Sequence, residues 1–155
     1  MNRKVQDWKS TGKKIVFTNG VFDILHVGHV DYLQKAKALG DVLIVAINDD
    51  ASVKKLNKGP ERPINPEKAR ALVIGALRCV DATIIFKDET PIEVIKSILP
   101  NVLVKGGDYD PMEKNPSMKT FIVGSAEVYA AGGQVVTIPL VQGFSSTNII
   151  GKIKG

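Results

Sequence analysis

The sequence has little cysteine and no long apolar run. Cys79 is the only cysteine among 155 residues, so no disulfide can form within the chain. No apolar stretch approaches the ~18 residues that a membrane helix requires, and residues 1–8 lack the apolar core of a signal peptide. We therefore expect a cytoplasmic protein that works without a membrane partner.

Aromatic residues are also scarce, at 6% of the chain, although the formal net charge is +5. A nucleic-acid surface would combine a basic stripe with interleaved aromatic side chains, whereas the basic residues here are scattered along the sequence. The positive charge fits a small phosphorylated ligand better than a nucleic acid. We expect small-molecule substrates and no nucleic-acid partner.

Two common nucleotide-binding motifs and one kind of nucleophile are missing as well. The sequence contains neither G-x-x-x-x-G-K-[ST] nor G-x-G-x-x-G, which argues against a P-loop enzyme and against a dinucleotide-dependent dehydrogenase. Cys79 lies in an apolar, helix-like context. A packed side chain is therefore a better interpretation of this cysteine than a nucleophile.

What the sequence does have is an alternation of apolar and amphipathic segments. Short apolar runs predict strands at 14–18, 42–47, 82–86, 102–105 and 135–139. Helix-like segments lie between and after them, at 27–39, 66–80, 90–100, 124–131 and 146–154. This order predicts an α/β fold with a doubly wound parallel sheet, in a single domain over 1–155.

Ligands of such a sheet bind beyond the carboxyl ends of the strands, at the point where the strand order reverses. Four segments of this chain follow predicted strands, at 19–29, 48–66, 105–109 and 142–147. Because parallel strands all end at the same edge of a sheet, we expect these four segments to lie together. A ligand site is predicted there.

Both histidines of the chain, His26 and His29, lie in the first of these segments with Gly28 between them. They are candidate metal ligands, structural histidines or groups that hold a phosphate. A zinc site needs about four ligands, or three and a water, and the sequence offers no third histidine. The predicted start of a helix favours an anion instead, and a glycine permits close approach of a ligand. Position and ligand count together favour phosphate binding.

The motif T-N-G-V-F-D at 18–23, followed by H-V-G-H at 26–29, resembles the H-x-G-H signature of the cytidylyltransferase-like nucleotidyltransferases. Segments in the ranges 36–56, 62–81, 98–109 and 143–150 are similar to the heptose 1-phosphate adenylyltransferase group. The resemblance covers nearly the whole chain. Glycerol-3-phosphate cytidylyltransferases are more distant, because they carry an arginine where this chain has Leu140.

The resemblance implies a Rossmann-like fold and a transfer reaction that uses ATP and Mg²⁺. An oxygen of D-glycero-β-D-manno-heptose 1-phosphate would attack the α-phosphorus of ATP, giving ADP-heptose and pyrophosphate for lipopolysaccharide or other cell-surface heptose. Neither a covalent enzyme intermediate nor a metal site made by the protein is expected. The group also implies a homodimer or a higher homo-oligomer.

The resemblance further implies roles for particular residues. The catalytic residues would be His26, His29 and Lys58. The residues that bind the nucleotide and its phosphates would be Thr18, Asn19, Gly20, Phe22, Gly28, Arg70, Arg78, Ser145, Ser146 and Thr147. The residues that bind the acceptor substrate would be Asp23, Lys55, Lys105, Gly106, Asp108 and Tyr109.

Simpler roles stay open for several of these residues. Asp23 is equally well interpreted as a cap that fixes its loop. Lys55 and Lys58 are alternatively interpreted as solvated side chains. Arg70 and Arg78 are eight residues apart on one predicted helix and would share a face, where surface ion pairs are the alternative. Residues 105–109 are alternatively a plain turn, and residues 145–147 an ordinary helix N-cap.

Other functions also stay open. One is a cytidylyltransferase that acts on a small phospho-alcohol such as glycerol 3-phosphate. Another, of a different class, is a nucleotide-binding regulatory module without catalysis. The segment 110–121 looks longer than usual after K-G-G-D-Y, and we consider a flap and an oligomer contact as its two roles.

Overall fold

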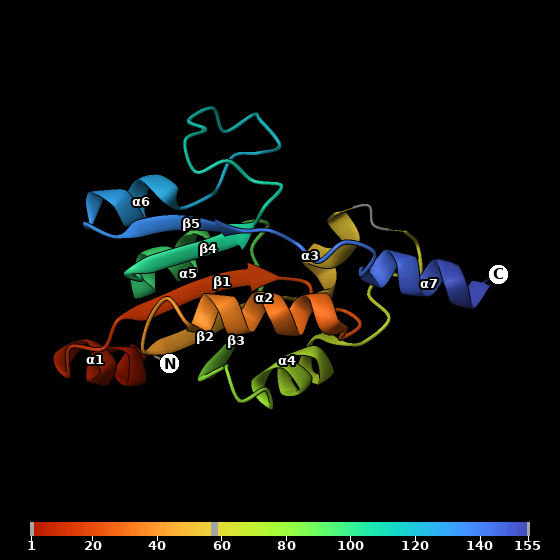
Figure 1. Ribbon diagram of the computed structural model, residues 1–155, viewed down its shortest axis with the longest axis horizontal. Helices are drawn as coiled ribbons and strands as arrows, with labels where there is room; N and C mark the ends of the chain where they lie inside the picture. The colour runs from red at the N-terminus through yellow and green to blue at the C-terminus, as the bar shows by residue number, and fades with distance from the viewer. Residues whose placement is uncertain (1, 57–58, 155) are drawn as a thin grey trace.

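A five-stranded parallel sheet forms the centre of the molecule (Figure 1). The computed structural model describes residues 2–56 and 59–154. The strands are β1 Ile15–Gly20, β2 Val42–Asn48, β3 Ala82–Phe86, β4 Val102–Gly106 and β5 Gln134–Ile138. They lie in the order β3-β2-β1-β4-β5, and all pairs are parallel. The predicted α/β fold is confirmed.

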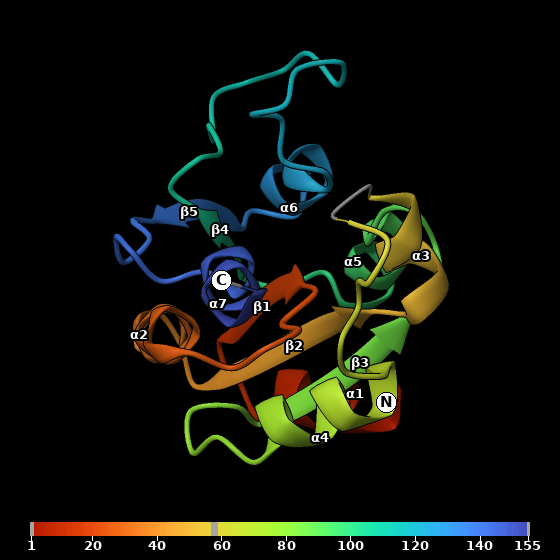
Figure 2. The same ribbon diagram turned by 90° about the vertical axis from the view of Figure 1, so that its right-hand side faces the viewer.

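Helices cover both faces of the sheet (Figure 2). On one face lie α2 Val27–Lys37 and α4 Glu67–Gly75; on the other lie α1 Asn2–Ser10, α5 Ile92–Ile98 and α6 Ser125–Ala130. Two further helices, α3 Asp50–Lys55 and α7 Ser146–Lys154, lie at the carboxyl ends of the strands. The helices after β1 and β2 share one face and those after β3 and β4 the other, so the strand order reverses between β1 and β4.

Two apolar clusters hold these layers together. Alternate residues of a strand point to opposite faces, so Phe17 and Ile44 pack beneath α1, α5 and α6, whereas Val16 and Leu43 pack beneath α2 and α4. Every residue of β2 is buried, which explains why its sequence is continuously apolar. The loops at the strand ends therefore start from a closely packed scaffold.

The structure corrects the predicted end of one helix. The apolar pattern predicts a helix over 66–80, but α4 ends at Gly75. Leu77 and Val80 follow in turns, in which each N–H donates to the carbonyl three residues earlier, and both side chains pack against the core. The apolar spacing continues past Gly75 because these turn residues are packed, not because the helix continues.

Two helices lie outside the predicted set. In α1, Val5 is buried and Trp8 packs against the same cluster. The short α3 occupies part of the segment 48–66, and the Asp49 carboxylate caps it by accepting a hydrogen bond from the N–H of Ser52. Among the described residues, none of the helices combines the length and the apolar character needed to cross a membrane.

Candidate functional site

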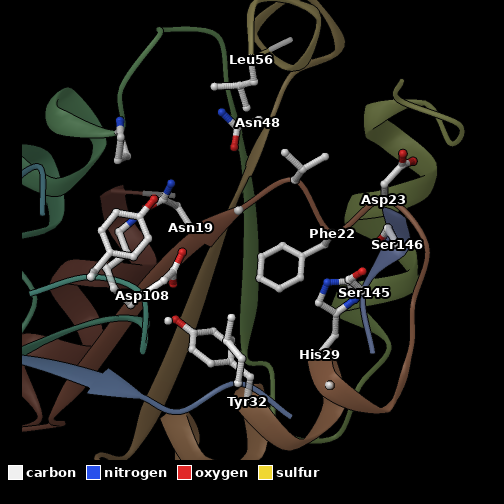
Figure 3. A pocket seen from close by; sticks show the side chains of 18 of the residues that line it. Asn19, Phe22, Asp23, His29, Tyr32, Asn48, Leu56, Asp108, Ser145 and Ser146 are labelled. Carbon is white, nitrogen blue, oxygen red and sulfur yellow. The ribbon is translucent and has the colours of Figure 1, made fainter. Parts of the chain in front are cut away.

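A cavity of about 620 Å³ lies at the carboxyl ends of β1 and β4, where the strand order reverses. All four predicted segments contribute to its wall. Figure 3 shows Asn19 and Asp108 on one side of this cavity and His29, Ser145 and Ser146 on the other. We call the first side, with Lys105 and Tyr109, the β4 end, and the second side, with His26, the histidine end.

Most of the predicted site residues line this cavity. They are Asn19, Gly20, Phe22, Asp23, His26, Gly28, His29, Lys105, Gly106, Asp108, Tyr109, Ser145, Ser146 and Thr147. Four predicted residues do not line it: Thr18, Lys55, Arg70 and Arg78. Lys58, the predicted catalytic lysine, lies outside the described residues.

The two histidine rings stack on each other at the start of α2. Their centroids are 3.8 Å apart with an interplanar angle of 23°, and the Phe22 ring meets His29 edge-on at 5.1 Å. His26 is the N-cap residue of α2, and its Nδ1 is buried without a hydrogen-bond partner among the described residues. Burial lowers the pKa of His26. The pair therefore presents two neighbouring imidazoles at a helix N-terminus, where an anion is stabilised.

The glycines around the pair make room for rings. A Cβ on Gly28 would lie 3.0 Å from Nδ1 of His26, and a Cβ on Gly20 would lie 2.9 Å from the Phe22 ring. Phe22 itself has a left-handed backbone with φ 48°, which costs about 1–3 kcal/mol for a residue with a side chain. Gly28 thus accommodates the imidazole of His26, which refines its expected role as an opening for the ligand.

Asp23 ties its loop to the segment after α3. Its carboxylate is fully buried and accepts hydrogen bonds from Nε of Arg62 and from the N–H groups of Ile64 and Asn65. Burial raises the pKa of Asp23, but these hydrogen bonds outweigh burial, and the pKa lies below its usual value. The carboxylate is an internal anchor, so the expected contact with the acceptor substrate is replaced by the capping role.

Arg70 is a second internal anchor. Its side chain is 1% exposed, and its guanidinium donates to the carbonyl oxygens of Asn65, Val21 and Asn48 and to the carboxylate of Asp50. The guanidinium is occupied by these partners and does not line the cavity. One partner, Asp50, forms the ion pair that was considered as the alternative, although Arg70 forms it from a buried position. Arg70 and Asp23 together hold the segment 59–66 against the loop after β1.

Three further predicted residues point elsewhere. Arg78 follows the end of α4 and lies beside Lys37 and Cys79 in a separate hollow, so it shares no helix face with Arg70. Lys55 is exposed and pairs with Glu89 at 2.9 Å. Thr18 is buried, and its hydroxyl bonds that of Tyr32 at 2.8 Å. Arg78 and Lys55 were assigned by their place in a motif, which does not determine where the side chain points. Thr18 was expected to contact the nucleotide through its backbone, and that contact stays a prediction.

The β4 end is built around a buried lysine. Nζ of Lys105 donates to Oδ1 of Asn19 and lies 5.3 Å from the centroid of the Tyr109 ring. Burial lowers the pKa of Lys105 to about 8, although the Asp108 carboxylate opposes this shift. A buried ammonium group that donates to one neutral acceptor is stabilised by an anion placed beside it.

Ser145 and Ser146 fasten α7 over the cavity. The Ser145 hydroxyl caps the helix by accepting the N–H of Asn148 at 3.0 Å. The Ser146 hydroxyl lies 3.3 Å from the carbonyl oxygen and 3.4 Å from the nitrogen of Ile24. Thr147 is exposed and lines the cavity. The helix N-terminus is therefore held beside His29 (Figure 3).

Arg62 is one of the cavity-lining residues that sequence reasoning missed. Its side chain is 5% exposed, lines the cavity and pairs with Asp23. A buried carboxylate requires a donor, and that is the one signal that points to such a partner. The signal does not say which arginine fills the role, because 39 positions separate the two residues.

Comparison with known proteins supports the motif. Residues 17–152 match the family model described as cytidylyltransferase-like. The chain is 51% identical over 154 residues to the bifunctional protein HldE of Yersinia enterocolitica and 49% identical over 150 residues to that of Azorhizobium caulinodans. These matches cover 99% and 97% of this chain but 30% and 29% of those proteins. The chain thus spans about three tenths of their length.

Solved structures agree with the fold. The crystal structure of the lipopolysaccharide core biosynthesis protein from Thermoplasma volcanium matches with a TM-score of 0.63 and 28% identity, over 84% of this chain and 98% of that one. A pantoate–beta-alanine ligase from Francisella tularensis matches with a TM-score of 0.56 and 16% identity, over 99% of this chain and 75% of that one. The second match supports the fold alone.

Proposed function

The chain belongs to the cytidylyltransferase-like family, and we propose from this that it transfers AMP from ATP to D-glycero-β-D-manno-heptose 1-phosphate. The products are ADP-heptose and pyrophosphate, and the pathway is the synthesis of lipopolysaccharide or other cell-surface heptose. The observation that carries the proposal is the stacked pair of His26 and His29 facing the cavity at the start of α2. The name of the Thermoplasma volcanium protein supports the pathway.

The histidine end holds the triphosphate in this proposal. An oxygen of the acceptor phosphate forms a bond to the α-phosphorus, while the bond from that phosphorus to the bridging oxygen breaks and its electron pair leaves with pyrophosphate. The N–H donors of His26 and His29, and those of the first turn of α7, stabilise the charge that grows on the phosphate oxygens. A bound phosphate also favours the protonated form of His26, against the effect of burial.

The β4 end receives the acceptor. Lys105 binds the acceptor phosphate, because the ammonium is buried and the Asp108 carboxylate only partly offsets that burial, so a phosphate beside it adds stabilising charge. Asn19 and Tyr109 hold the ammonium in place from two sides. With the nucleotide at one end and the acceptor at the other, the reacting atoms meet between them, and positioning supplies much of the rate enhancement.

Magnesium enters with the nucleotide in this proposal. The described residues contain no group of three or more side chains that suit a metal ion, and Mg²⁺ is commonly held by substrate phosphates with one or two carboxylates. Asp108 lines the cavity and takes part in none of the ion pairs between described residues, so it fits this role. When bound, Mg²⁺ would shield the phosphate charge.

Other parts of the proposal rest on the family resemblance. We keep Lys58 as a catalytic lysine, as the resemblance implies. A homodimer or higher homo-oligomer and a cytoplasmic location belong to the proposal as well, since ATP and sugar phosphates are the substrates. Light scattering of the purified protein measures the oligomeric state.

A pyrophosphate-release screen tests the function. ATP, CTP and GTP are each combined with heptose 1-phosphate and with glycerol 3-phosphate, and the His26→Ala variant is run beside the wild type as the control. Turnover with ATP and heptose 1-phosphate alone is the expected result. Turnover only with CTP would overturn the choice of nucleotide, and nucleotide binding without any turnover would support the regulatory module instead.

A further inference from the structure

The segment 107–124 joins β4 to α6 without any helix or strand. Connections longer than about 12–15 residues are uncommon in compact domains and are usually functional or disordered. This one rises clear of the sheet and of α6 in both views (Figures 1 and 2). The transfer chemistry assigned to the two ends of the cavity uses Asp108 and Tyr109 at the start of this segment and leaves residues 110–124 without a role.

The segment has a definite shape that it makes for itself. Side-chain oxygens of Asp110, Glu113 and Asn115 each accept a hydrogen bond from the N–H two residues ahead. At its base the N–H of Asp110 donates to the carbonyl of Thr120 at 2.9 Å. A long surface loop whose ends meet and whose own groups hold it together is an Ω-loop, a kind of loop that is frequently functional.

The two arms of this loop differ in what they face. The returning arm lines the cavity through Pro116, Met118, Lys119 and Phe121. The outgoing arm carries Lys114, which is exposed and does not line the cavity. Lys119 is also exposed and forms no ion pair with any described residue. One loop therefore holds two solvent-exposed lysines, and one of them lines the site.

The returning arm belongs to the acceptor side of the cavity. The loop begins directly after Tyr109, which lines the β4 end with Lys105 and Asp108. Transfer brings the acceptor phosphate up to a triphosphate, and the repulsion between these anions must be offset by cations. Lys105 is a buried cation at this end, and Lys119 adds a second one on a flexible stem.

We propose that Lys119 binds the phosphate of the acceptor and that the returning arm, residues 116–121, determines which phosphorylated acceptor the enzyme uses. The proposal rests on the proposed nucleotidyl transfer. Met118 and Phe121 offer apolar surface on the same arm for the carbon skeleton of the acceptor. A change in this arm would thus alter acceptor preference without moving the histidines.

Steady-state kinetics of Lys119→Ala, Lys119→Arg and Lys114→Ala test the proposal, with the wild type as reference. We expect Lys119→Ala to raise KM for heptose 1-phosphate about tenfold, because one charge-assisted hydrogen bond contributes roughly that factor. KM for ATP should change by less than about twofold, because Lys119 contacts the acceptor phosphate and not the nucleotide in this proposal. Lys119→Arg should recover part of the loss, and Lys114→Ala should match the wild type.

Two results would overturn the proposal: an unchanged acceptor KM in Lys119→Ala, or equal increases in acceptor KM for Lys119→Ala and Lys114→Ala. An increase in KM for ATP alone would also overturn it, by placing Lys119 on the nucleotide. If the wild type uses a different phosphorylated alcohol, the proposed substrate is wrong, and the same contrast on that acceptor still tests the arm. A wild type inactive with every acceptor contradicts both proposals.

Discussion

The two ends of the cavity are held in different ways. At the histidine end, ties reach across the sequence, from Arg62 to Asp23, from Arg70 to Val21 and from Ser146 to Ile24. The β4 end has one such tie, from Lys105 to Asn19. The loop over that end is held mostly by turns within itself, with one hydrogen bond from the Tyr129 hydroxyl to the carbonyl of Pro111. The histidine end is thus locked to distant parts of the chain, whereas the loop over the β4 end depends mainly on its own residues.

The largest expected effect comes from the locked end. We predict that His29→Ala lowers kcat by about 10²–10⁴-fold, the range typical for loss of a group that acts in the transition state. The Kd for ATP should change much less, because the imidazole acts mainly on charge that develops during reaction. Pyrophosphate release and calorimetric titration measure the two quantities. Small, equal losses in kcat and in the affinity for ATP would mean that the histidine end binds the nucleotide without stabilising the transition state.

A second prediction concerns the ion pair between Arg62 and Asp23. Arg62→Ala leaves the carboxylate of Asp23 buried without its cation, and we expect the free energy of unfolding to fall by about 3 kcal/mol. Lys55→Ala is the matched control, because it breaks an ion pair that is exposed on both sides and should leave stability unchanged. Urea denaturation followed by circular dichroism measures both. Similar urea midpoints for the two variants would contradict the view that the Arg62–Asp23 pair holds the histidine end in place.

The smallest effect is expected at the β4 end, as a pH dependence. Because the pKa of Lys105 is lowered to about 8, its ammonium is present below that pH and lost above it. The acceptor phosphate is mostly doubly charged above pH ~7, so KM for the acceptor should rise about twofold by pH 8, where half of the ammonium is lost, and then by up to about tenfold per unit. Lys105→Met should raise KM throughout and remove the slope. A slope that persists in Lys105→Met would point to another group.

Much of the fold could be predicted from the sequence. The apolar run of β2 and the alternation of strands with helices are local patterns, and they were sufficient to predict the parallel sheet. The gathering of four loops at one edge followed from the geometry of parallel strands. His26, His29 and Lys105 therefore line the cavity as expected.

Side-chain directions were less predictable. Arg70 and Arg78 look equivalent in sequence, yet one is buried under four hydrogen bonds and the other lies in a separate hollow. The difference arises because α4 ends at Gly75, three residues before Arg78, and Leu77 packs against the core in the turn that follows. The pairing of Arg62 with Asp23 likewise depends on the folded path of a whole loop. Tertiary contacts of this kind produce no periodic pattern in the sequence, so they could not be predicted from it.

The contact between Ser146 and Ile24 joins positions 122 residues apart. During synthesis the sheet can form as its strands emerge, but α7 reaches the loop after β1 only once nearly all of these residues have left the ribosome. The wall of the cavity at the histidine end is therefore completed last. A partly made chain has the strands but not the finished pocket, which needs this last helix to dock.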